Sequence, residues 1–109
     1  MALRAKIIDL TTGEIDSELS AQINAEQHAE FFAIIEQHSN QFPLLKRMSN
    51  YYADTEYAHD ELDSLIREVE DTAGLVNTGS QIYQFTSPFH RVCCLAFFRK
   101  KRVGVYADS

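Results

Sequence analysis

Apolar and polar residues alternate near both ends of the chain. Over residues 3–8 the apolar side chains fall on one face of an extended segment and the basic ones on the other, which is typical of a half-buried strand. Residues 103–107 alternate in the same way. We expect the two strands to pair, so that both ends of the chain meet in one sheet. Residues 11–13 predict a turn, residues 14–16 form either a short return strand or a loop, and residues 16–23 stay unassigned.

The next segment has the period of a helix. Asn24 can cap its start, and Gln27 stands three residues on, where it approximates a capping box. The helix should end near Asn40, because Pro43 disfavours helical geometry at the residue before it. Residues 25–39 place four side chains at the spacing i, i+3, i+4 and i+7, which predicts one buried face: His28, Phe31, Phe32 and Ile35.

Two more helical patterns follow, joined by a short loop over residues 53–56. The first runs over residues 43–52 and places five side chains along one side: Leu44, Leu45, Met48, Tyr51 and Tyr52. The second runs over residues 59–72, with a C-terminal cap expected at Gly74. Its apolar positions again have the spacing i, i+3, i+4 and i+7: Leu62, Leu65, Ile66 and Val69.

The last helix is predicted from its start signal and its apolar content. Residues 77–80 read as a turn, and Ser87 followed by Pro88 is typical of a helix start. Residues 89–98 are apolar nearly all round, which predicts a central buried helix, and four cations close it: Arg99, Lys100, Lys101 and Arg102. The chain is therefore expected to be one α+β domain, mainly helical, with four to five helices packed on a small sheet formed by the N- and C-terminal strands.

Composition narrows the class of partner. The chain has 109 residues and a formal net charge of −6, which argues against nonspecific nucleic-acid binding and suits a basic protein partner. No apolar run is long enough for a membrane span or a signal peptide, so we expect no membrane partner. The adjacent Cys93 and Cys94 are expected to be buried free thiols, which is consistent with a reducing cytoplasm.

Motifs for catalysis or cofactor binding are not found in the sequence. It contains no glycine-rich phosphate loop and no hydrolase motif. The best local pair of metal ligands is His90 and Cys93, three residues apart, for which a packed or helix-capping histidine is the favoured interpretation. We therefore expect no catalytic residue, no cofactor and no metal, and no enzymatic activity.

Carboxylates and tyrosines gather in the middle of the chain. Eight acids lie between residues 54 and 71, and they form either a solvated helix face or an acidic recognition surface: Asp54, Glu56, Asp60, Glu61, Asp63, Glu68, Glu70 and Asp71. Tyr51, Tyr52 and Tyr57 bracket the first two of these acids. Tyrosine rings are common anchors of interfaces, and the alternative is that they belong to the core.

Two segments resemble a known class of protein. Residues 42–71, FPLLKRMSNYYADTEYAHDELDSLIREVED, combine a proline-started leucine helix, an aromatic and acidic joint, and a second helix with spaced leucines. Residues 99–108, RKKRVGVYAD, combine a helix end, a glycine and a short strand. Both resemble small bacterial immunity proteins of polymorphic-toxin and contact-dependent growth inhibition systems.

The resemblance implies a cytoplasmic protein that binds one cognate toxin and blocks it. A nuclease toxin with a basic active-site groove would attract an acidic partner. The expected contacts are surface inferences of our own: Tyr52, Asp54, Glu56, Tyr57, Asp60, Glu61 and Asp63. Two other classes remain open, a structural or regulatory interaction module that forms a homodimer without a toxin, and a small hydrolase with a concave pocket.

Overall fold

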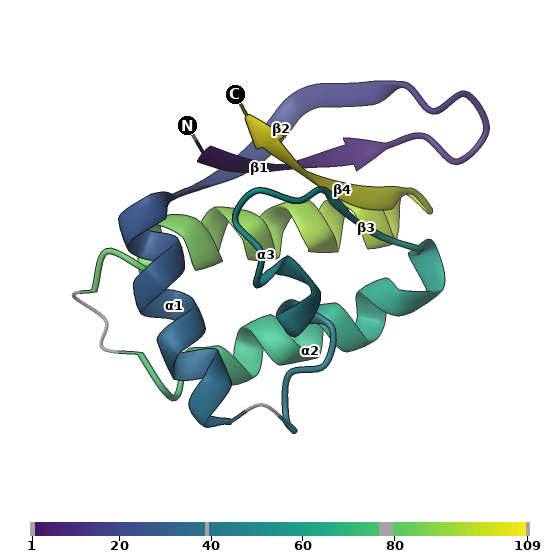
Figure 1. The fold of residues 1–109 in the computed structure, drawn as a ribbon. Helices are drawn as coiled ribbons and strands as arrows, with labels where there is room; N and C mark the ends of the chain where they lie inside the picture. The colour runs from purple at the N-terminus through teal and green to yellow at the C-terminus, as the bar shows by residue number, and fades with distance from the viewer. Residues whose placement is uncertain (1, 39, 77–79, 109) are drawn as a thin grey trace.

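A four-stranded antiparallel sheet, covered on one face by helices, forms the molecule (Figure 1). A computed structural model describes residues 2–38, 40–76 and 80–108. In chain order its elements, including two short 3₁₀ helices labelled η, are β1 (Ala2–Ile8), β2 (Ile15–Asn24), α1 (Ala25–Gln37), η1 (Leu45–Met48), β3 (Thr55–Tyr57), η2 (His59–Glu61), α2 (Leu62–Thr72), α3 (Tyr83–Phe98) and β4 (Arg102–Asp108).

The prediction of four to five helices on a sheet made by the terminal strands is wrong. Over the described residues the chain has three α-helices, and two further strands extend the sheet. Residues 43–52, predicted as a helix, form only the 3₁₀ turn η1, whose residue spacing resembles that of an α-helix over so short a stretch. The unassigned residues 16–23 lie in β2, where pairing with β1 satisfies their backbone groups.

The predicted pairing of the terminal strands is confirmed. β1 and β4 run antiparallel in an unbroken register from Ala2 opposite Asp108 to Ile8 opposite Arg102. The strand order is β2-β1-β4-β3, so β2 and β3 form the two edges of the sheet. Both chain ends consequently lie close together at one end of the sheet (Figure 1).

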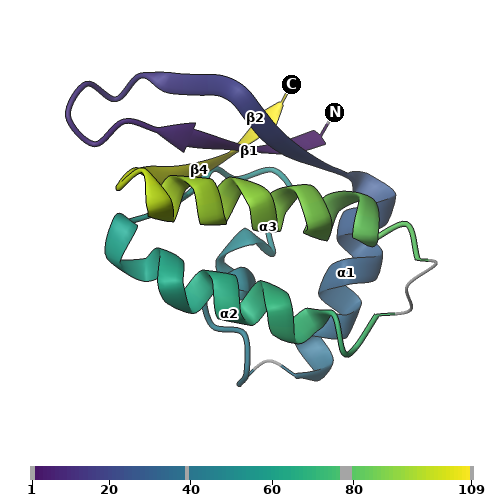
Figure 2. The same ribbon diagram turned by 180° about the vertical axis from the view of Figure 1, so that it is seen from behind.

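Helix α3 forms the middle layer between the sheet and α2, as both views show (Figures 1 and 2). Its buried residues include Phe89, Val92 and Cys93, which confirms the predicted central helix. The helix begins at Tyr83, however, and Pro88 lies inside it, so the predicted start at Ser87 is wrong. None of the described helices is long and apolar enough to cross a membrane.

The first turn of α3 explains the early start. The Thr86 amide donates to the carbonyl of Ile82, a fully buried residue that ties this turn to the core. Pro88 lies in the second turn of this helix. Because proline has no N–H group, the helix loses one backbone hydrogen bond there. The turn predicted at residues 77–80 falls, except for its last residue, outside the described residues.

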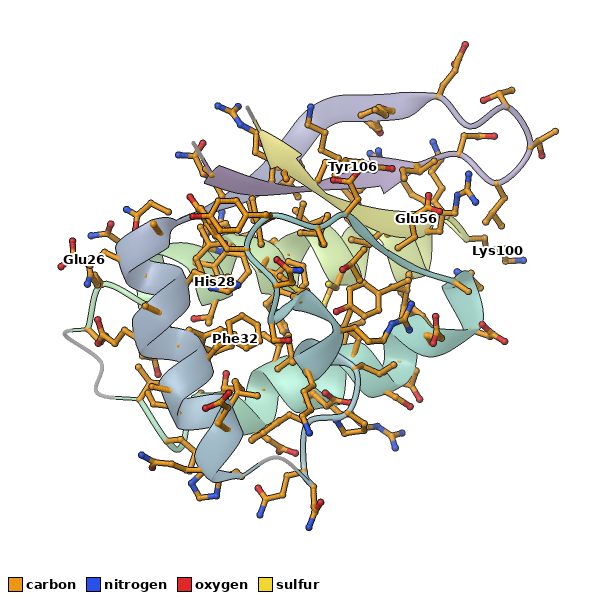
Figure 3. The ribbon with its side chains drawn as sticks, in the orientation of Figure 1. Glu26, His28, Phe32, Glu56, Lys100 and Tyr106 are labelled. Carbon is orange, nitrogen blue, oxygen red and sulfur yellow. The ribbon has the colours of Figure 1, made fainter. Side chains whose placement is uncertain are left out.

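The predicted N-terminal cap of α1 is confirmed. Asn24 Oδ1 accepts from the Gln27 amide at 2.8 Å, and Gln27 Oε1 accepts from the Asn24 amide at 3.0 Å, which together form a capping box. From this helix His28 and Phe32 point into the molecule, whereas Glu26 points away from it (Figure 3). Helix α1 thus contributes a buried face to the core, including Phe31 and Ile35.

Two helix ends differ from expectation. At the end of α2 Gly74 keeps a negative φ and donates to the Asp71 carbonyl in a 3₁₀ turn, so it is not the predicted left-handed cap. At the end of α3 Lys100 has φ 59°, and the amides of Lys100 and Lys101 donate to the carbonyls of Phe97 and Ala96. This is a Schellman motif with lysine at the position that usually holds glycine.

Replacing this lysine should therefore stabilise the protein. The left-handed conformation costs a residue with a Cβ atom about 1 kcal/mol or more, and glycine adopts it without that cost. We expect Lys100→Gly to raise the free energy of unfolding by about 0.5–1 kcal/mol in urea denaturation. Lys100→Ala is the matched control because it removes the same side chain but keeps the Cβ atom, and it should give no such gain. An equal gain from both variants would contradict this explanation.

Candidate interaction surface

Strand β3, the loop before it and the turn η2 after it carry most of the exposed part of the predicted site. Four of the predicted contact residues are exposed there, and we call them the β3 surface: Tyr52, Asp54, Glu56 and Asp60. The Tyr52 side chain is 73% exposed. Its ring meets that of the buried Tyr51 edge-on, with centroids 5.4 Å apart, and Tyr51 contacts the ring of His28 on α1. The exposed Tyr52 ring therefore packs against a buried aromatic cluster formed by Tyr51 and His28.

Hydrogen bonds hold the loop and β3 in place. Asp54 Oδ1 accepts from the Ala107 amide of β4 at 2.9 Å, which extends the pairing of β3 with β4. Thr55 Oγ1 donates to the Arg47 carbonyl at 2.9 Å, and the Arg47 guanidinium donates to the Glu56 carbonyl. The backbone that presents the β3 surface is thus fixed from two sides, by β4 and by η1.

Tyr106 lies beside Glu56 on the outer face of the sheet (Figure 3). Burial is the main cause that raises the Tyr106 pKa, and the charge of Glu56 raises it further. The ring lies over Gly104, where a Cβ atom would collide with it and would come within 2.5 Å of Ile8 Cδ1. With Asp54, Thr55 and Glu56, Tyr106 lines a shallow depression of about 370 Å³. Sequence reasoning missed this tyrosine, although the alternation of β4 places it on the outer face.

Tyr57, one of the predicted partner contacts, is buried in the structure and does not belong to the exposed surface. Its side chain is fully buried, its Oη donates to the Leu44 carbonyl at 2.6 Å, and the Arg47 guanidinium carbon lies 4.7 Å from its ring centroid. Burial strongly raises the pKa of its hydroxyl. The inward position follows from β3 pairing, which places Tyr57 opposite the buried Val103.

Two predicted carboxylates already have partners. Glu61 forms an ion pair with Arg47 at 2.6 Å and accepts from the Ala58 amide at 2.9 Å, so it caps η2. Asp63 pairs with Arg67 one helical turn on at 3.2 Å, in an exposed pair that contributes little stability. In the part of the chain that the structure describes, Asp60 makes no ion pair and no side-chain hydrogen bond, which leaves its charge available to a partner.

Glu68 is one of the eight acids expected on a solvated helix face or an acidic recognition surface, but its side chain is buried. Its carboxylate accepts from the Leu45 amide at 2.9 Å and from the Leu44 amide at 3.1 Å, which caps η1 from α2. Desolvation raises the pKa of Glu68, and the two amides act in the opposite direction. The signal in the sequence was its position three residues after the buried Leu65, on the inner side of α2.

Removing the Glu68 carboxylate should loosen η1. Glu68→Ala leaves the amides of Leu44 and Leu45 without an acceptor, and hydrogen bonds to a charged group contribute about 1.5–3 kcal/mol. We expect the free energy of unfolding to fall by about 2 kcal/mol or more in urea denaturation. Asp71→Ala is the control, because Asp71 lies on the same helix and is exposed. Equal effects of the two substitutions would show that Glu68 does not cap η1.

The raised pKa of Glu68 also predicts a pH dependence with a defined sign. Protonation is favoured in the native state, so this contribution to stability is complete below the ordinary pKa of 4.5 and is lost as the pH rises through the native value. The stability of the wild type relative to Glu68→Gln should therefore fall between pH 4 and pH 7. Unfolding curves measured at both pH values test this, and a relative stability that rises with pH would contradict it.

The only chemically suggestive cluster of the described helices lies between α2 and α3. His90 Nε2 lies 3.1 Å from Glu70 Oε2 and 3.7 Å from the sulfur of Cys94, so Cys94 rather than Cys93 faces this histidine. Both cysteines are free, and Cys94 is only half-buried. Burial, and next the charge of Glu70, raise the Cys94 pKa, which disfavours the thiolate form that nucleophilic catalysis uses.

Metal ligands do not converge over the residues that the structure describes: no group of three His, Cys, Asp or Glu side chains is placed to hold an ion. Two other histidines, His28 and His59, make structural contacts. His28 donates to the Met48 carbonyl at 2.8 Å, and His59 donates to the Lys101 carbonyl at 3.0 Å while it stacks on Phe97.

No family model matches the chain, and no curated protein or solved structure matches it.

Proposed function

We propose that this protein is a cytoplasmic immunity protein that binds a basic bacterial toxin domain through the β3 surface and blocks it. The observation that carries the proposal is the exposure of Tyr52 next to Asp54 and Glu56, on a backbone fixed by hydrogen bonds to β4 and η1. The protein acts by binding, and no reaction is assigned to it.

The energetics of association favour such a surface. A tyrosine brings a large contact area with few rotatable bonds, and a fixed loop pays little ordering entropy on binding. The Tyr52 ring is held by Tyr51, so it is oriented before the partner arrives. These features suit an anchor residue at the centre of an interface.

Charge determines the kind of partner. Glu56 and Asp60 are exposed, and the net charge of the chain is −6. A toxin with a basic groove for phosphates provides the complementary field, which accelerates encounter and aligns the two proteins. A carboxylate surface seated over that groove would exclude the nucleic-acid substrate.

The direct test is co-purification of the tagged protein with the product of the gene immediately upstream. The proposal predicts a stable one-to-one complex and survival of cells that express the upstream product together with this chain. Absence of both results would overturn it. Light scattering on the isolated protein distinguishes the immunity protein from the alternative, a homodimeric interaction module. Such a module would be dimeric without any partner.

The contribution of the β3 surface is tested by charge reversal. Glu56→Lys with Asp60→Lys should slow association with the toxin by about tenfold or more at low ionic strength, because the steering field is reversed. Both side chains are exposed, so circular dichroism and the melting temperature should change little.

The matched control is Glu36→Lys with Asp71→Lys. These exposed acids lie in the last turns of α1 and α2, far from β3, and the control changes the net charge by the same amount. Lysine also suits the negative end of a helix dipole, so the fold should be kept. Equal slowing by both pairs would show that net charge, and not the β3 surface, governs association.

A further inference from the structure

An apolar groove lies between α3 and the edge strand β2. Its lining residues, which define the α3 groove, are Leu19 of β2 and five residues of α3: His90, Arg91, Cys94, Leu95 and Phe98. Its volume is about 490 Å³, within the range of binding clefts. Helix α3 lies in front in Figure 2, whereas β3 lies in front in Figure 1.

The sequence of α3 carries more apolar surface than its core requires. Phe89, Val92, Cys93 and Ala96 form the buried side of the helix. On another side of the helix Leu95 and Phe98 line the groove, with Arg91 four residues before Leu95. Phe98 is 84% exposed, and in the same groove Leu95 and Leu19 of β2 are only partly buried. Side chains of this size and exposure are typical of a surface that is covered by a partner.

Strand β2 offers backbone hydrogen bonds beside this groove. It is ten residues long and pairs only with β1, so its other edge is unpaired over the residues that the structure describes. Its odd-numbered residues Leu19, Ala21 and Ile23 face the helices. A strand added to this edge would place every second side chain over the α3 groove.

The charge at one end of the groove identifies the complementary chemistry. Arg91 is exposed and makes no ion pair with any described residue, and it also borders the neighbouring pocket between α2 and α3. Arg91 and Phe98 are about 10 Å apart along the helix axis. In a bound strand, side chains at alternate positions lie about 6.6 Å apart. Two such apolar side chains would therefore occupy the groove, and a carboxylate next to them would reach Arg91.

We propose that the α3 groove binds an extended segment of a second protein, which adds to the edge of β2. The segment carries large apolar side chains at alternate positions, and a carboxylate next to them pairs with Arg91. This site is separate from the β3 surface, and it does not depend on the proposed immunity function.

The test uses a displayed library of random decapeptides, selected on the full-length protein. The enriched peptides should alternate large apolar residues and contain an aspartate, a glutamate or a free C-terminal carboxylate at one end. Phe98→Gln should weaken binding of the synthetic peptides by about tenfold or more in fluorescence polarisation, because it removes apolar contact without changing the charge. Leu75→Gln is the control, since Leu75 is also exposed but lies outside the groove.

The selection is repeated on the Arg91→Glu variant. The peptides enriched on this variant should carry basic instead of acidic residues beside the apolar positions, because the charge at position 91 is reversed. The proposal is overturned if no peptide is enriched, or if Phe98→Gln binds the selected peptides as tightly as the wild type. Dimerisation of the isolated protein that is abolished by Phe98→Gln would also overturn it, since a second copy would then fill the groove. Toxin binding, measured in parallel, should be unchanged in Phe98→Gln, which separates the two surfaces.

Discussion

The buried carboxylate of Glu68 is the contact on which the placement of residues 42–54 depends. This segment crosses the molecule with one turn of 3₁₀ helix, so most of its backbone groups need partners from elsewhere. Glu68 accepts from two of its amides, Tyr57 donates to the Leu44 carbonyl, and His28 donates to the Met48 carbonyl. These bonds come from three different elements, and they fix the segment that leads into β3.

The position of η1 in turn decides which charges face solvent. Arg47 reaches from η1 to the Glu56 carbonyl and to the Glu61 carboxylate, so Glu61 is neutralised within the molecule while the Glu56 side chain stays exposed. The same guanidinium lies over the ring of the buried Tyr57, whereas Tyr52 is exposed. The acids therefore divide into structural and exposed groups, and only the exposed group can serve the proposed interface.

The sequence predicted elements whose signals are local. The capping box at Asn24, the apolar period of α2 and the alternation of the terminal strands each depend on neighbouring residues, and each is present in the structure. Strand β2 also alternates, at Ile15, Leu19, Ala21 and Ile23, but its small and polar residues weakened the signal. Tertiary contacts determined the rest. Strand β3 forms through backbone pairing with β4, and Glu68 is held in the interior by hydrogen bonds from backbone amides of the η1 segment.

The candidate site was predictable only in part for the same reason. Tyr52, Asp54 and Glu56 are exposed, whereas Tyr57 is buried by the pairing of β3 with β4 and Glu61 is paired with Arg47 of η1. An acidic residue on an amphipathic helix is assigned to solvent by its chemistry, and a long-range hydrogen bond reverses that assignment. Hydrophobic periodicity and composition therefore predict core residues better than interface residues.

The most direct measurement of this account is amide hydrogen exchange by NMR at Leu45 and Ala107, in the wild type and in Glu68→Ala. The Leu45 amide donates to Glu68, and the Ala107 amide donates to Asp54 on the β3 surface. If Glu68 positions the surface through η1, both amides are protected in the wild type, and both lose protection in the variant while α1 keeps its own. Full protection of Ala107 in Glu68→Ala would contradict the account, because the β3 surface would then be held independently of η1.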